Sequence, residues 1–258
     1  MFFGNKLVHL FFNRLRFRAD EFQIPHLHKA LFVSSKLFVT TLNMKQLIFL
    51  PFLLAATLSF GQSLLKKQKR DSLTTAKFSV VSAFLNLSPS DNIADIGTGA
   101  GYSLIPIANN CPECKFTVED IDSSTCNIRT LAKKINNTGS KARIENFTFY
   151  YGTEKVTNLP SSKFNKVLIF DVIHEMTYKN EMLNDIKKIL QKNGSIFIEE
   201  ILVHKSVKKD RVCNYPFLTE VEFKKVLADN NLVIKKESIT FDTGNNKYIK
   251  IFECVSQP

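Results

Sequence analysis

The sequence predicts an α/β protein with a doubly wound, mostly parallel seven-stranded sheet and a C-terminal antiparallel hairpin. Three observations lead to this fold class. Short apolar segments typical of buried strands alternate with segments whose apolar residues recur at helical spacing. Such alternation is characteristic of βαβ units, which build parallel sheets. Near its C-terminus the chain has two strand-like segments around the turn "DTGNN", which predicts a hairpin.

The first half of the predicted domain alternates as a parallel sheet requires. A helix is expected over 78–87, where Ser88-Pro89 stops it. Strands are expected over 92–96, 115–121 and 142–151, with helices over 104–108 and 126–135 between them.

The second half continues the pattern. Residues 166–170 are continuously apolar, as in a strand buried on both faces. Apolar residues recur at helical spacing over 182–190, and Asn193-Gly194 is expected to close that helix. A strand over 195–202, a helix over 217–230 and the hairpin strands over 232–240 and 247–255 follow.

A glycine-rich turn directly follows the first strand. Asp95 stands at the end of that strand, and Gly97, Gly99 and Gly101 come next. Glycine is needed where the backbone turns sharply and a ligand approaches closely. A dinucleotide fingerprint has glycines at offsets zero, two and five, whereas Tyr102 occupies offset five here. The spacing therefore disfavours a hydride-transferring oxidoreductase.

An acidic residue ends the second strand. Asp120 lies 23 residues after Gly97, close to where an acid meets the ribose hydroxyls of nucleotides in such folds. A carboxylate accepts hydrogen bonds from both hydroxyls. The alternative is a plain glycine turn beside a surface aspartate.

Several segments together are similar to a known family. "ADIGTGAGYS", "VEDID", "SKFNKVLIFDVIHEM" and "KKILQKNGSIFIEE" resemble the motifs of the seven-stranded class I methyltransferases that use S-adenosyl-L-methionine. The resemblance covers Phe78 to Val255. Within this family, "YYGTEKVTNLP" and "DVIHE" are similar to a subgroup whose members often carry export signals or lipid anchors.

The resemblance implies a cofactor site. Asp95 would order the glycine loop, which passes under the amino acid part of the cofactor. Asp120 would hold the ribose, and Ile121 would pack on the adenine. Thr153 or Glu154 would lie near the adenine amino group, where family members commonly have Asp, so Thr153 departs from the pattern. Asp171 would face the methionine end or the substrate.

Methyl transfer needs a base only when the acceptor must lose a proton. His174 is the best candidate, because it follows the fourth strand at the edge where ligands bind and titrates near neutral pH. The alternative is a histidine bonded to backbone at a helix start. Glu175 is a weaker candidate. In the segment after the fifth strand, Asp210, Arg211 and Tyr215 are candidates to face the acceptor, with a solvated loop as the alternative.

The segment "MKQLIFLPFLLAATLSFGQ" has the three parts of a secretory signal. Lys45 supplies positive charge, 47–58 is apolar, and Ser59-Phe60-Gly61 offers a cleavage site. We therefore expect a signal peptide over 44–61, a polar lead-in over 62–77 and the methyltransferase-like domain over 78–258. Residues 1–43 form a doubtful extension if Met44 is the true start. A membrane anchor and a buried helix are the alternatives to the signal, and without export the protein would be cytoplasmic or membrane-anchored.

The spacing of Cys111 and Cys114 is that of a redox pair or half a metal site. No second CxxC accompanies it, so we assign no metal ligands. A disulfide, which export would favour, and free thiols stay open.

The charge points to no particular macromolecular partner. Of the net charge of +11, residues 1–61 carry seven basic and two acidic residues, which leaves a mildly basic remainder. Without a dense basic run, we expect no nucleic acid partner, membrane contact only through the export signal, and a small-molecule methyl acceptor. The alternative function is a non-catalytic exported binding module on the same fold.

Overall fold

The computed structural model describes residues 62, 63, 65, 72–205, 215–242, 244 and 246–257. The predicted extension over 1–43 and the predicted signal over 44–61 lie outside these residues. By its contacts the chain divides into Met1–Lys69 and Arg70–Pro258, and the fold below belongs to the second unit. No helix among the described residues is long and apolar enough to cross a membrane.

The described residues form a seven-stranded sheet in the order β3-β2-β1-β4-β5-β7-β6. Its strands are β1 (Asn92–Ile96), β2 (Lys115–Asp120), β3 (Phe147–Tyr151), β4 (Phe164–Phe170), β5 (Leu190–Val203), β6 (Leu232–Asp242) and β7 (Lys247–Ser256). The first five pair in parallel, whereas β7 is antiparallel to both β5 and β6. The predicted fold class and the terminal hairpin are therefore confirmed.

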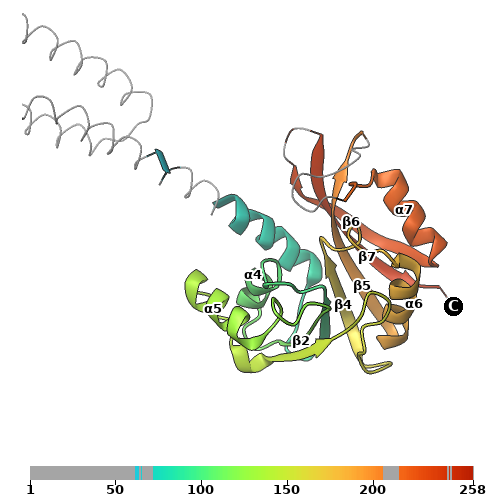
Figure 1. Cartoon of the computed structure of the whole chain (residues 1–258). Helices are drawn as coiled ribbons and strands as arrows, with labels where there is room; N and C mark the ends of the chain where they lie inside the picture. Colours follow the sequence, from blue (N-terminus) through green and yellow to red (C-terminus); the bar gives the residue numbers. More distant parts are fainter. Residues whose placement is uncertain are drawn as a thin grey trace, which may run out of the picture. The chain divides into compact units, whose positions relative to one another are not determined.

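Helices cover both faces of the sheet (Figure 1). A helix over 72–85, α4 (Leu104–Asn110) and α5 (Ile128–Thr138) contribute to one apolar cluster with Phe116 and Val118. The helices α6 (Lys179–Ile189) and α7 (Glu220–Asp229) contribute to the other cluster. Each fully buried large apolar side chain contributes roughly 1.5–3 kcal/mol to folding. These two cores hold the carboxyl edge of the parallel strands in a fixed place.

Several element boundaries differ from the prediction because of local capping. The described helix over 72–85 overlaps the predicted polar lead-in over 62–77, so this part of the lead-in is helical. Asn127 accepts a hydrogen bond from the Thr130 amide, which starts α5 at Ile128 rather than at 126. Thr219 and Glu222 form a capping box, which starts α7 at Glu220 rather than at 217.

Two predicted segments are wrong over part of their length. The third strand was expected from residue 142, but β3 begins at Phe147, which pairs with Phe116, and Ile144–Asn146 form a 3₁₀ turn. The expected closing turn at Asn193-Gly194 lies inside β5. Leu190 already pairs with Phe164, and the register then shifts, so the strand absorbs these two residues as an irregularity.

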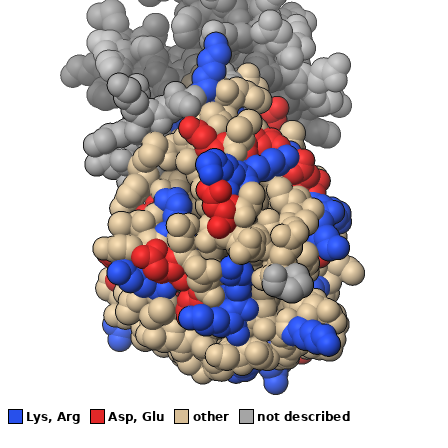
Figure 2. Space-filling view, turned by 90° about the vertical axis from the view of Figure 1, so that its right-hand side faces the viewer, with Lys and Arg blue, Asp and Glu red and all other residues tan. Residues whose placement is uncertain are grey.

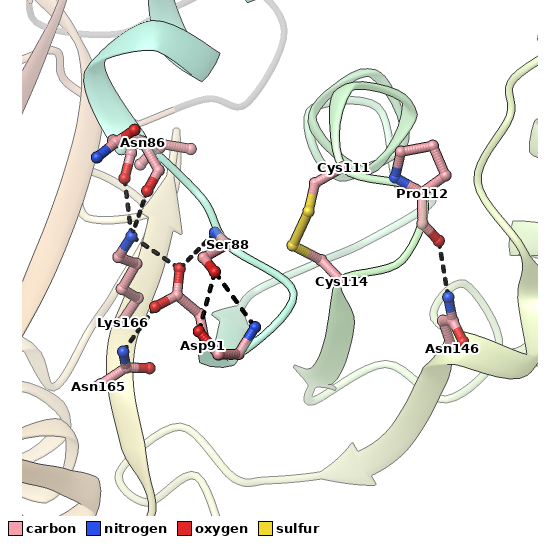
Figure 3. The surroundings of a disulfide bond; sticks show 11 residues. Asn86, Ser88, Asp91, Cys111, Pro112, Cys114, Asn146, Asn165 and Lys166 are labelled. Atoms are coloured by element: carbon pink, nitrogen blue, oxygen red, sulfur yellow. Dashed lines mark hydrogen bonds and ion pairs between the residues drawn. A yellow bond between two sulfur atoms is a disulfide. The ribbon is translucent and has the colours of Figure 1, made fainter.

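A disulfide joins Cys111 and Cys114 in the turn between α4 and β2. This pairing settles the alternative that the sequence left open between a disulfide and free thiols. In Figure 3 the turn is also joined to the segment before β3, because the Asn146 side-chain amide donates to the Pro112 carbonyl at 2.8 Å. In the same view Lys166 of β4 binds the Asp91 carboxylate at 2.8 Å, which joins β4 to the segment before β1.

Candidate functional site

A cavity of about 430 Å³ opens at the carboxyl ends of β1, β2 and β4. Ligands of open α/β sheets bind at this edge, where the loops diverge. The structure brings most of the predicted site residues together here. Those that line the cavity are Asp95, Gly97, Gly99, Asp120, Ile121, Thr153, Glu154 and Asp171.

The glycine loop forms one wall of the cavity. The amides of Gly97 and Thr98 both donate to the Glu119 carbonyl, at 2.9 and 3.0 Å, which turns the chain sharply after β1. Gly97 has φ of +71°, and a Cβ there would lie 2.7 Å from Val172. Gly99 also has positive φ, but a Cβ there would meet no atom within 4 Å. Gly101 is buried and packs against Ile105 instead of lining the cavity.

Asp120 ties this loop to the end of β2. Its Oδ2 accepts from the Gly99 amide at 2.7 Å, and its Oδ1 accepts from the Asp122 amide at 2.8 Å. A carboxylate has about four acceptor positions, so both oxygens keep capacity for a ligand. The arrangement suits a pair of neighbouring hydroxyls.

Two buried carboxyls, Asp95 and Glu119, lie beside Asp120. Burial, opposed by a hydrogen bond from Thr98, raises the pKa of Asp95 to about 7. Burial, reinforced by the charge of Asp120, raises the pKa of Glu119 to about 8. Within the described part of the chain Glu119 Oε1 has no hydrogen-bond partner, although only 2% of the residue is exposed. Glu119 lines the cavity, and a buried polar atom without a partner calls for an explanation, of which a ligand group is one.

The segment after β3 forms the opposite wall. Thr153 Oγ1 accepts from the amides of Lys155 and Val156, both at 3.2 Å, so this oxygen stabilises the turn. Glu154 lines the cavity beside it. Ile121 is 59% exposed, and it offers an apolar surface to a planar group.

His174 lies behind the cavity and is only 5% exposed. Its Nδ1 is 2.7 Å from Glu200 Oε1, and its Nε2 is 3.6 Å from Glu175 Oε1. Glu175 lines the cavity, whereas His174 and Glu200 do not. Burial raises the pKa of Glu200, against the hydrogen bond from His174. The backbone amide of His174 also donates to Glu200 Oε2 at 3.2 Å, so Glu200 holds both the ring and the backbone of this residue. The role of His174 as a base stays a prediction.

The segment expected to recognise the acceptor is described in part. Tyr215 lines the cavity, whereas Asp210 and Arg211 lie outside the described residues. Sequence reasoning missed Glu119 and Glu200. Each is a charged residue near the end of an otherwise apolar strand, in "KFTVED" and "SIFIEE", and that was the available signal.

Comparisons with known proteins agree on one type of domain. A family profile described as "Methyltransferase domain" matches residues 87–253. No match to a curated protein sequence was found.

Solved structures share the fold at low identity. A SAM-dependent methyltransferase from Aquifex aeolicus is 18% identical, with 74% of this chain and 96% of that chain covered and a TM-score of 0.55. A geranyl diphosphate methyltransferase in complex with SAM is 11% identical, with 71% and 85% covered and a TM-score of 0.55. A glycopeptide N-methyltransferase complexed with sinefungin is 11% identical, with 71% and 94% covered and a TM-score of 0.56.

Proposed function

Because the chain belongs to the methyltransferase-domain family, matched over residues 87–253, we propose that it transfers a methyl group from S-adenosyl-L-methionine to a small-molecule acceptor. One observation carries this proposal. The glycine loop, Asp120 and the exposed Ile121 line one cavity at the carboxyl edge of the sheet. S-adenosyl-L-methionine is the cofactor that a domain of this family implies, and the wall of this cavity fits its parts.

The fit is chemical. Asp120 has acceptor capacity left for two ribose hydroxyls while its bonds to backbone amides hold it in place. The open position at Gly99 lets a ligand approach the backbone closely. Ile121 gives the adenine an apolar surface. Asp95 is bonded to Thr98 Oγ1 at 2.7 Å, which orders the loop.

The bound cofactor supplies a methyl group on a positively charged sulfur. A nucleophile attacks the methyl carbon directly, and the sulfur leaves as a neutral thioether. The protein's task is then to align the acceptor and, where necessary, to take its proton. We propose that Glu175, which lines the cavity, takes this proton and shares it with His174, whose Nε2 is 3.6 Å away. Glu200 orients the imidazole through Nδ1, which leaves Nε2 facing Glu175.

The cavity volume of about 430 Å³ supports a small acceptor, and Tyr215, from the segment that follows β5, lines this cavity. The face shown in Figure 2 gives no support for a large anionic partner. On the face in Figure 2, Lys and Arg side chains are interspersed with Asp and Glu, which is typical of an ordinary solvated surface. We propose that the acceptor diffuses freely and that the protein has no nucleic acid partner.

We also propose that the protein is exported through the apolar segment that starts at Met44. The disulfide between Cys111 and Cys114 supports this, because such bonds persist in oxidising compartments and are rare in the cytosol. Peptide mapping of the native protein tests the proposal. Peptides from 44–61 in the mature protein would contradict it.

The proposed function is tested by titrating the full chain with S-adenosyl-L-methionine in a calorimeter. We expect micromolar-range binding that Asp120→Ala weakens by about 10- to 100-fold, because hydrogen bonds to charged groups are worth roughly 1.5–3 kcal/mol each. Asp122→Asn is the matched control, because it removes a charge from the same turn without changing a residue that lines the cavity.

A methyl-transfer assay with labelled cofactor and a panel of small acceptors then separates an enzyme from a binding module. Binding without transfer to any acceptor would favour the module. Absence of binding to a folded chain would contradict the proposed function itself.

A further inference from the structure

The charge of the cavity is strongly one-sided. Six carboxyl residues line it, namely Asp95, Glu119, Asp120, Glu154, Asp171 and Glu175. Among the described residues that line it there is no Lys, Arg or His. A low-dielectric cleft lined by one sign of charge attracts ligands of the opposite sign.

One of these carboxyls points independently to a ligand. Glu119 is 2% exposed, and its Oε1 has no hydrogen-bond partner among the residues that the structure describes. The carboxyl packs so tightly against Gly152 that a Cβ there would lie 2.0 Å from Oε1. Because the ionised form of such a group is costly when it is buried and unpaired, Glu119 holds a proton when no cation is bound.

The groups that surround Glu119 add negative charge. The charges of Asp120 on β2 and of Asp95 on β1 both raise its pKa. Tyr150 lies opposite it on β3. Glu154 lines the same cavity from the segment after β3, and Asp171 and Glu175 line it from the segment after β4. These neighbours oppose the loss of its proton until a cation enters.

We propose that the cavity distinguishes the cationic sulfonium cofactor from its neutral thioether product through Glu119 and Asp95, which give up a proton when the cation enters. The inference rests on the proposed function and explains how the site would prefer the sulfonium cofactor to its thioether product. S-adenosyl-L-methionine and S-adenosyl-L-homocysteine share the ribose, the adenine and the amino acid group. They differ by the methyl group and by the positive charge that the sulfur carries when it is methylated. The preference would help the product to leave.

The direction of the pH dependence follows from linkage. A ligand whose binding releases protons binds more tightly as the pH rises, by at most tenfold per pH unit for each proton released. Burial raises the pKa of Asp95 to about 7 and that of Glu119 to about 8. Affinity for the sulfonium cofactor should therefore rise between pH 6 and 8, and affinity for the thioether should rise less.

The test is calorimetric titration of the full chain at pH 6.5 in two buffers of different ionisation enthalpy. At this pH the amino groups of the ligands stay protonated, since α-amino groups titrate near 8. We expect release of about one half to one proton with S-adenosyl-L-methionine and clearly less with S-adenosyl-L-homocysteine. Sinefungin, in which an amine replaces the sulfonium, should behave as the cationic ligand does.

Glu119→Gln is the decisive variant, because glutamine keeps the shape of the neutral acid and cannot ionise. It should release less proton and should lower the ratio of sulfonium to thioether affinity about threefold to tenfold at pH 8. Glu113→Gln is the matched control, since Glu113 is exposed and does not line the cavity. Circular dichroism establishes that each variant is folded.

Each outcome decides the proposal. Equal proton release with the two ligands, in wild-type protein that binds both, would overturn it while leaving cofactor use intact. Selective release that persists in Glu119→Gln would overturn the assignment to Glu119 and leave Asp95. Absence of binding by either ligand would instead contradict the proposed function.

Discussion

At the scale of single residues, Gly97 combines two separate demands. Its φ of +71° is strained for any residue with a side chain, and a Cβ would lie 2.7 Å from Val172. Gly139 has a similar φ of +62°, but a Cβ there meets nothing within 4 Å. The two glycines therefore separate the cost of the backbone conformation from the cost of the steric contact.

We expect Gly97→Ala to lower the free energy of unfolding by about 2–5 kcal/mol, from strain of roughly 1–2 kcal/mol and overpacking of roughly 1–3 kcal/mol. Gly139→Ala should cost only the strain. Adding Val172→Ala to Gly97→Ala should recover part of the loss, beyond the sum of the single changes. Denaturant unfolding of the wild-type protein, the three single variants (Gly97→Ala, Gly139→Ala and Val172→Ala) and the double variant measures these free energies. Equal costs for the two glycine variants would show that the contact with Val172 is not limiting.

At the scale of elements, the disulfide stabilises the turn between α4 and β2. Cys111 and Cys114 are three residues apart, so the bond closes a very short loop. In the chain-entropy model such a loop gives about 2 kcal/mol. The hydrogen bond from Asn146 to the Pro112 carbonyl joins the same turn to the segment before β3 independently of the disulfide.

Replacing both cysteines by serine should therefore lower the melting temperature by about 4–8 °C while the fold is kept. The same decrease should follow from treating wild-type protein with a reductant, and the reductant should not affect the double variant. A change confined to the double variant would mean that the serines, rather than the lost bond, cause the decrease. A fully unfolded variant would mean that the hydrogen bond alone does not hold the turn.

The sequence predicted an element's boundaries well where the pattern of apolar residues determines them. It predicted them less well where pairing between strands determines them. The strand expected over 92–96 matches β1 to the residue, because its apolar run ends directly at the glycine loop. Asn193-Gly194 has the composition of a turn, but a register shift between β4 and β5 accommodates it, and no single segment encodes a register shift. The same limit explains why β3 starts later than its alternating pattern indicates.

The site was predictable to the same extent. Parallel strands place Asp95, Asp120 and Asp171 at one edge, so the topology alone brings them together. Glu119 was missed because an acid inside an apolar strand gives no sign of which cavity it will line. The pairing of His174 with Glu200 was missed because the two residues are 26 positions apart and meet only across β4 and β5.

At the scale of the whole molecule, buried acids link stability to pH. In the unfolded chain Asp and Glu titrate near 4, whereas burial raises the pKa of Asp95 to about 7 and of Glu119 to about 8. Burial also raises the pKa of Glu199 and Glu200. Between pH 4 and pH 8 the folded protein therefore binds more protons than the unfolded chain. The stability that is present near pH 4 is lost as the pH rises through the folded-state pKa values.

Acids with lowered pKa act in the opposite direction but in another range. Burial acts to raise the pKa values of Glu220 and Glu237, but their bonds to Lys224 and Lys250 outweigh it and lower both values, so their contribution is lost only as the pH falls below about 4.5. Above pH 5 the acids with raised pKa values therefore determine how stability changes with pH. We therefore expect the melting temperature to fall by about 5 °C or more between pH 5 and pH 8.5.

Differential scanning calorimetry across this range measures the slope, and Glu119→Gln identifies its origin. The variant cannot ionise at residue 119, so its melting temperature should fall less steeply than that of the wild-type protein. Asp122→Asn should keep the wild-type slope, because hydrogen bonds from Ser124 and Thr125 lower the pKa of Asp122 to about 2, and this group stays ionised throughout. A melting temperature that rises with pH, or a slope that Glu119→Gln leaves unchanged, would mean that Glu119 is already ionised in the folded protein. Glu119 would then have no proton to release when the cationic cofactor binds.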